Sequence, residues 1–144
     1  MELKNILVAF DSSSFSNRAF KNALEIADPK ISKITIATVI TGIYQPSIGF
    51  SMKYSKDLLE KHTKVLHKIF SKLQRDAKKT GISLSLKILH DPSVSKAILN
   101  YVYSHKVDLV VIGSHGRTGI NRVILGSVAN EVANKAKCPV MVVK

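Results

Sequence analysis

The sequence predicts a single α/β domain whose five-stranded parallel sheet is doubly wound and Rossmann-like, with helices on both faces. The chain has 144 residues, which is the length of one compact domain and enough to bury a core without disulfides or metal. Short apolar segments rich in β-branched residues alternate along it with segments of helical periodicity. Regular alternation of strands and helices is typical of a parallel sheet covered on both sides. One domain is therefore expected over residues 1–144.

Five segments carry the strand pattern and four carry the helix pattern. The strands are expected at residues 4–10, 33–40, 82–90, 107–112 and 139–143, and the helices at about 14–27, 54–79, 92–105 and 127–137. Residues 41–52 contain two glycines and a proline and are expected to form a loop.

Capping residues support the predicted ends of two helices. Ser12–Ser14 offer N-caps for the first helix, and Gly81 is placed to end the second. The second helix is predicted to turn one apolar stripe toward the sheet, made of Leu58, Val65, Leu66, Ile69 and Leu73.

The apolar patterns also predict the strand order. Segments 4–10 and 107–112 are the most uniformly apolar, as expected for central strands. Segment 82–90 alternates between apolar and polar residues, which favours a place nearer an edge. The order 3-2-1-4-5 fits both observations. It brings the ends of the first and fourth strands together at a topological switch point, where such sheets bind ligands.

The charge is strongly basic, with 22 Lys and Arg against 10 Asp and Glu and a formal net charge of +12. Such a balance points first to a polyanionic partner. However, nine basic and three acidic residues fall in 51–80, where the basic ones form a stripe over residues 53–79, along the predicted second helix. A solvated face explains that stripe, and no aromatic residues interleave with it to stack bases, so a nucleic-acid partner is not favoured.

Compartment and membrane contact can also be predicted from the sequence. Cys138 is the sole cysteine, so no internal disulfide can form. The apolar runs are far shorter than the ~20 residues that a membrane helix needs. The first residues lack the apolar core of a secretory signal. A cytoplasmic protein without membrane contact is expected.

Two segments at the predicted switch point carry the candidate chemistry. After the fourth strand comes GSHGRTG, and Gly126 and Ser127 then open a helix. Backbone amides of such a loop and helix N-terminus can form a phosphate cradle. Asp11 follows the first strand, where a carboxylate would bind ribose hydroxyls or a cation such as Mg²⁺. The chain contains no G-x-x-x-x-G-K-[ST] motif, and the first turn lacks G-x-G-x-x-G.

The pattern Gly113-x₂-Gly116-x₉-Gly126-Ser127 resembles the ATP-binding signature of the universal stress protein family. The likeness extends to ILVAFDSSSFSNRAF at the start and to nearly all of residues 107–144, and is weakest at about 41–80. It implies a bound ATP or other adenine nucleotide, with Mg²⁺ or Mn²⁺. One departure is Ser12, where many members carry glycine, so the turn after Asp11 is expected to be stiffer.

The resemblance also implies a role for each site residue. Asp11 would contact the sugar and the metal, Ala9 would border adenine, and the backbone of Val39 would bind the adenine edge. Ile112 and Gly113 would lie under the ribose and phosphates. The triphosphate contacts would be Gly116, Gly126, Ser127 and Val128.

Three functions are compatible with these features. The leading one is a nucleotide-binding stress-response protein acting as a sensor or adaptor, with at most slow ATP hydrolysis, because no general base is evident and no catalytic residue is assigned. The resemblance implies a homodimer that pairs through residues Pro139–Val143 at an exposed sheet edge. The alternatives are an adenine-nucleotide α-hydrolase-type enzyme, whose usual SGGxDS or HIGH-like motifs do not occur, and a basic nucleic-acid-binding module.

Overall fold

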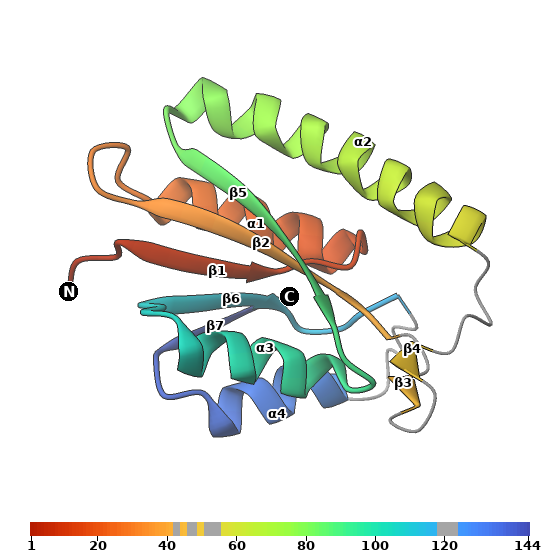
Figure 1. The fold of residues 1–144 in the computed structure, drawn as a ribbon. Coiled ribbons are helices and arrows are strands. Elements are labelled where there is room, and N and C mark those ends of the chain that lie inside the picture. Colours follow the sequence, from red (N-terminus) through yellow and green to blue (C-terminus); the bar gives the residue numbers. More distant parts are fainter. Residues whose placement is uncertain (42–43, 46–48, 51–55, 118–123) are drawn as a thin grey trace.

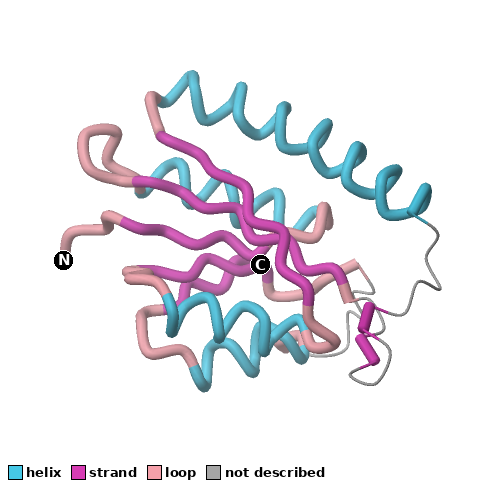
Figure 2. Tube along the Cα trace, viewed as in Figure 1, coloured by secondary structure: helices cyan, strands magenta, loops and turns pink. Residues whose placement is uncertain are grey.

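The computed structural model describes residues 1–41, 44–45, 49–50, 56–117 and 124–144. It confirms the predicted architecture, an all-parallel five-stranded sheet in the order β5-β2-β1-β6-β7 with helices on both faces (Figures 1 and 2). The strands of this sheet are β1 (Asn5–Ala9), β2 (Lys33–Ile40), β5 (Ser83–His90), β6 (Leu109–Gly113) and β7 (Val140–Val143). The helices are α1 (Ser14–Ile26), α2 (Lys56–Thr80), α3 (Val94–Ser104) and α4 (Ser127–Lys135).

Two hydrophobic cores fill the space between the sheet and its helices. In β1, Ile6 and Val8 pack under α1 and α2, where Phe20 and Leu73 are buried. The alternate residues of the same strand pack against α3 and α4 on the other face. Because successive strand residues point to opposite faces, a strand that is apolar at every position supplies both cores. This explains why β1 and β6 are the most uniformly apolar segments.

The expected helix ends are confirmed where capping residues predict them. The Ser13 side chain accepts a hydrogen bond from the backbone N–H of Ser16 and caps α1. At the C-terminal end of α2, Gly81 adopts a φ of 73°, and the N–H of Ile82 donates to the carbonyl of Ala77 at 3.1 Å. A glycine with positive φ followed by this six-to-one bond is a Schellman motif, which satisfies the last carbonyls of the helix.

Three details of the prediction are corrected. Residues 44–45 and 49–50 lie in the segment expected to be a loop, but they pair as short antiparallel strands, β3 (Tyr44–Gln45) and β4 (Gly49–Phe50). Val65 was assigned to the buried stripe of the second helix but is 55% exposed, whereas Ala77 is buried in its place. The third helix begins at Val94 after the N-cap Ser93, not at Pro92.

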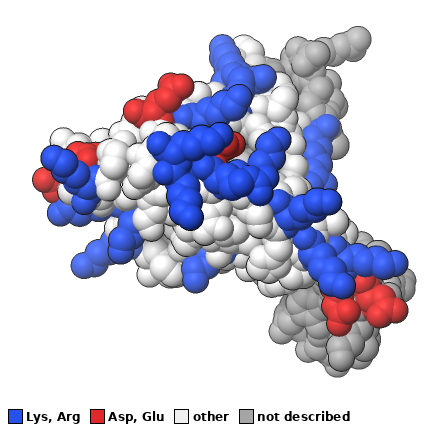
Figure 3. Space-filling model, turned by 90° about the horizontal axis from the view of Figure 1, so that it is seen from above, with Lys and Arg blue, Asp and Glu red and all other residues white. Residues whose placement is uncertain are grey.

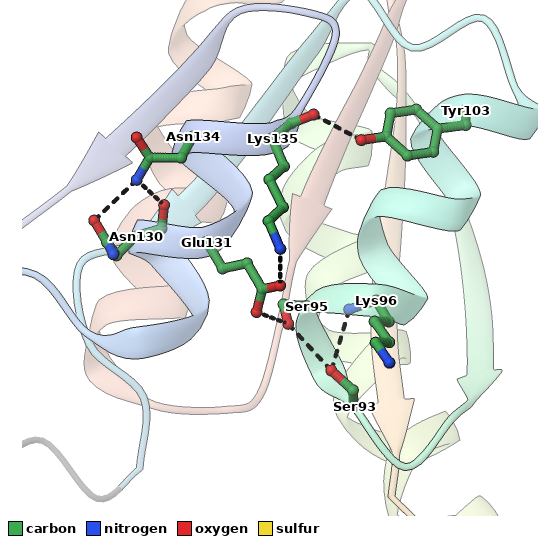
Figure 4. A network of polar contacts seen from close by, with 8 residues as sticks. All are labelled: Ser93, Ser95, Lys96, Tyr103, Asn130, Glu131, Asn134 and Lys135. Atoms are coloured by element: carbon green, nitrogen blue, oxygen red, sulfur yellow. Dashed lines mark hydrogen bonds and ion pairs between the residues drawn. The ribbon is translucent and has the colours of Figure 1, made fainter.

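A polar network joins α3 to α4 at the edge of the second core (Figure 4). The hydroxyl of Ser95 donates to Glu131 Oε2 at 2.5 Å, and Lys135 Nζ lies 2.8 Å from Glu131 Oε1. The hydrogen bonds from Lys135 and Ser95 lower the pKa of Glu131 below its usual range. These contacts favour the ionised carboxylate, which helps to fix α4 against α3 and so places its N-terminus.

Candidate functional site

A cavity of about 1040 Å³ opens at the carboxyl end of the sheet, where β1 and β6 lie side by side. Its size is typical of a small-molecule or cofactor site. All nine residues that the sequence singles out line it: Ala9, Asp11, Val39, Ile112, Gly113, Gly116, Gly126, Ser127 and Val128. They come from four different elements and loops, and the predicted strand order is what brings them together.

Asp11 links the two loops at the switch point. Its Oδ1 accepts the backbone N–H of Ser13 at 2.9 Å, and its Oδ2 accepts the backbone N–H of Arg117 at 3.2 Å. The Arg117 Nε in turn donates to the carbonyl oxygen of Asp11 at 2.6 Å. This pair of contacts between residues 106 apart in sequence holds the glycine loop after β6 against the turn after β1.

The donor set places a limit on metal binding. Within the described part of the chain there is no group of three His, Cys, Asp or Glu side chains able to hold a metal ion. Asp11 is the one carboxylate among the described residues that line the cavity. Mg²⁺ is commonly held by one or two carboxylates together with substrate phosphates. The Asp11 carboxylate therefore fits a cation that arrives with a phosphorylated ligand.

The turn after Asp11 stores backbone strain at Ser12, whose φ is 69°. A residue with a side chain pays about 1–2 kcal/mol in this left-handed region, and glycine does not. This φ is consistent with the glycine that many members of the family are expected to carry here, because glycine adopts it without that cost. That the turn is stiffer with Ser12 remains a prediction.

Replacing Ser12 with glycine is expected to raise the free energy of unfolding by about 0.5–1 kcal/mol, because the strain relieved exceeds the added chain entropy of glycine. The hydrogen bond accepted here, from the side chain of Asn17, goes to the backbone oxygen of residue 12 and survives the change. Urea denaturation measures the difference. Ser12→Ala keeps the strain and is the matched control; a gain from alanine equal to that from glycine would contradict the argument.

The three glycines of the motif are required for different reasons. A Cβ at Gly113 would lie 2.7 Å from the Cβ of Phe15, so this glycine lets α1 pack against β6. A Cβ at Gly116 would meet Asp11 Oδ2 at 3.0 Å, and one at Gly126 would meet the carbonyl oxygen of Ser114 at 3.0 Å. Close contacts within the chain thus explain why each of the three positions is glycine, without reference to a ligand.

The N-terminus of α4 faces the cavity with backbone amides that the helix does not use. Its N-cap is Gly126, which supplies no side-chain cap, whereas serines cap α1 and α3. The N–H of Gly126 donates to the carbonyl of Ser114 at 2.7 Å, so that amide is not available to a ligand. The predicted phosphate cradle is corrected in this respect, because not every loop amide is free to contribute to it. The next three amides, from Ser127, Val128 and Ala129, precede the first intrahelical bond and border the cavity.

The rest of the cavity lining is largely apolar, and part of it could not be predicted from the sequence. Besides Val39, it is formed by Ile40 at the end of β2, His62 and Leu66 of α2, and Val94 and Ile98 of α3. The helical periodicity of α2 indicates which of its residues turn inward, but it does not tell where the helix crosses the sheet. The sequence predicts only that the cavity lies at the carboxyl end of β2. It does not predict that side chains of α2 and α3 would line it.

His115 also lines the cavity, between the glycines at 113 and 116. Its Nδ1 lies 3.1 Å from the Oγ of the buried Ser114, and its ring packs 5.3 Å from the ring of Phe15. The guanidinium carbon of Arg18 lies over the Phe15 ring, 4.7 Å from its centre. The imidazole is thereby fixed to the loop and to α1.

Comparisons with known proteins show the family to which this chain belongs. The chain matches the Universal stress protein family over residues 2–144. It is 32% identical to universal stress protein MJ0531 of Methanocaldococcus jannaschii, over 98% of this chain and 82% of that relative. The structure of universal stress protein UspA from Lactobacillus plantarum is similar with a TM-score of 0.85 at 26% identity, covering 100% of this chain and 99% of that one. A universal stress protein solved in complex with cAMP has a TM-score of 0.72 at 25% identity, covering 98% and 97%. The chain therefore belongs to the universal stress protein family.

Proposed function

We propose that the chain binds an adenine nucleotide in the cavity at the carboxyl end of its sheet. The observation that carries the proposal is that one cavity combines two unlike kinds of lining, the open N-terminus of α4 and the apolar surface around Val39 and Ile98. A helix N-terminus suits phosphate, and an apolar wall suits a base. The cAMP complex of a relative at 25% identity supports the same ligand class.

Within this proposal each residue group takes one part of the nucleotide. Val39 and Ala9 border the base, and Asp11 accepts hydrogen bonds from ribose hydroxyls. The amides of Ser127 and Val128, with the loop at Gly116, bind the phosphates. Where the ligand is ATP, Asp11 would be the residue that helps to hold Mg²⁺ or Mn²⁺, which would neutralise the charge of the phosphates.

Nucleotide occupancy, and not turnover, is the proposed signal. The Asp11 carboxylate already accepts two backbone N–H groups, which leaves it poorly suited to activate water as a general base. We therefore propose a sensor or adaptor role in the cytoplasm, with at most slow ATP hydrolysis. No contact among the described residues of the cavity favours the α-hydrolase-type alternative.

A homodimer through the last strand is part of the same proposal. Strand β7 ends the sheet, and each of its four residues is half-buried in the single chain. Among the described residues no strand lies on its outer side. An apolar edge strand of this kind favours pairing with a second copy along Pro139–Val143.

In the part of the chain that is described, no helix is long and apolar enough to cross a membrane.

Calorimetry tests the nucleotide proposal. AMP, ATP with Mg²⁺ and GTP with Mg²⁺ are titrated into the protein at high micromolar concentration. Both adenine nucleotides are expected to bind, and GTP at least about tenfold more weakly, a difference of about 1.4 kcal/mol. Binding of AMP should survive EDTA, because its contacts need no cation. No heat with either adenine nucleotide, together with no adenine nucleotide released from the natively purified protein, would refute the proposal.

A further inference from the structure

Helix α2 carries a row of cations along its outer side. Six basic residues recur at steps of three or four residues, and all are exposed; this cationic stripe consists of Lys61, Lys64, Lys68, Lys72, Arg75 and Lys79. At 100° per residue they fall within one narrow arc of the helix, opposite the buried residues Leu73 and Ala77. The first and last are 18 positions apart, so the stripe is about 27 Å long at 1.5 Å per residue.

Little on the protein itself neutralises this row. Within the described residues, the one ion pair that reaches the stripe joins Lys79 to Asp76 at 3.4 Å, and both side chains of that pair are exposed. Figure 3, seen from the side of α2, shows blue Lys and Arg side chains gathered on this face with few red ones between them. Holding so many like charges in a row raises the energy of the unbound protein, which a polyanion would relieve.

We propose that the cationic stripe binds the phosphodiester backbone of a nucleic-acid duplex without reading its sequence. A duplex presents one negative charge per ~1.7 Å of its axis, so a row of six cations about 27 Å long can neutralise phosphates along its whole length. Five of the six are lysines, which act as flexible point charges on phosphate and carry no base-reading fork.

The composition of the stripe argues against two other partners. A protein interface needs apolar or aromatic anchors and is depleted in lysine, whereas Val65 is the sole large apolar side chain on α2 described as well exposed. A membrane-surface helix needs a free apolar face, but that face of α2 is packed on the sheet, with Leu73 4% and Ala77 1% exposed. The missing aromatic residues exclude base stacking on single strands but not backbone contact.

The proposal does not depend on nucleotide binding. The α2 residues that border the cavity, His62 and Leu66, lie on the inward side of the helix, away from the stripe. The stripe thus stays accessible whether the cavity is filled or empty. Loss of nucleotide binding and loss of duplex binding are consequently separate outcomes.

Two triple variants of equal net charge test the proposal. Lys64→Gln, Lys68→Gln and Lys72→Gln remove the centre of the stripe, and glutamine keeps a good helix propensity. Lys30→Gln, Lys33→Gln and Lys106→Gln remove three exposed charges elsewhere and form the control. Fluorescence anisotropy measures binding to labelled 20-bp DNA and RNA duplexes between 50 and 200 mM salt, and circular dichroism confirms the fold of each variant.

For the wild type, log affinity against log salt should fall with a slope of about −5, at ~0.9 per neutralised phosphate. The stripe variant should reduce the magnitude of that slope by about 3, and the control should leave it unchanged. Two duplexes of different sequence should bind equally.

Equal slopes for both variants would mean that only net charge matters. Stripe-dependent binding to polyglutamate or to anionic vesicles that is tighter than to either duplex would assign the surface to a protein or a membrane. Each of these results, or no duplex binding at 50 mM salt, overturns the proposal.

Discussion

Replacing Gly113 with valine is expected to lower the free energy of unfolding by about 3 kcal/mol, the upper part of the range for overpacking a core. A Cβ at this position would lie 2.7 Å from the Cβ of Phe15 and 2.9 Å from its carbonyl carbon. The second atom is backbone, held by α1, so it cannot rotate out of the way. The helix must shift from β6, and urea or thermal denaturation measures the cost.

Gly116→Ala provides the matched control from the same motif. Its Cβ would meet Asp11 Oδ2 at 3.0 Å, which is the end of a side chain that can adjust by a few tenths of an ångström. The expected loss is below about 1 kcal/mol, as for most changes at exposed positions. If both variants lost stability equally, the first glycine of the motif would not be explained by helix packing.

This contrast shows what a sequence motif leaves unresolved. The pattern of three glycines predicts a loop that approaches a ligand, and all three positions do border the cavity. Yet the space at Gly113 is taken by α1, and the amide of Gly126 is used by Ser114. A glycine motif indicates that a side chain is not tolerated at a position, but it does not indicate whether a ligand or another part of the protein occupies the space beside that glycine.

The fold was predictable because each local pattern agreed with the global arrangement. Segment 33–40 has the same bounds in the structure as in the prediction, since its β-branched residues, the breakers on either side and burial all favour one strand. The alternation at 82–90 correctly placed β5 at the edge. Parallel strands joined by helices leave few possible topologies, so local patterns were sufficient.

The failures occur where the decisive contacts are made between segments far apart in the chain. Val65 lies at the margin of the apolar stripe of α2, and only the crossing of the helix over β5 decides that it faces solvent. The hydrogen bonds between Asp11 and Arg117 join residues 106 apart, so no local pattern predicts them. The role of Asp11 as a link between loops was therefore missed, while its place in the cavity was not.

Changing Ser127 to proline is expected to weaken nucleotide binding about tenfold to a hundredfold while leaving the stability of the unliganded protein unchanged or slightly higher. Ser127 is the first residue of α4, where the N–H makes no intrahelical bond and proline is well tolerated. Gly126 before it has φ −66° and ψ 158°, which is the conformation that a following proline prefers. The loss corresponds to about 1.5–3 kcal/mol, the contribution of one hydrogen bond to a charged group.

Ser127→Ala separates the amide from the hydroxyl, because it removes the Oγ and keeps the N–H. Calorimetry with AMP measures both variants, and thermal unfolding without ligand shows that α4 is intact. If the backbone carries the phosphate contact, alanine binds nearly as well as serine and proline does not. Equal losses would assign the contact to the hydroxyl, and no loss in either would place the phosphates away from α4. The helix itself does not use the N–H of Ser127, so a loss of binding at unchanged stability would place the effect on the cavity side of this residue, where proline removes the donor and adds its ring.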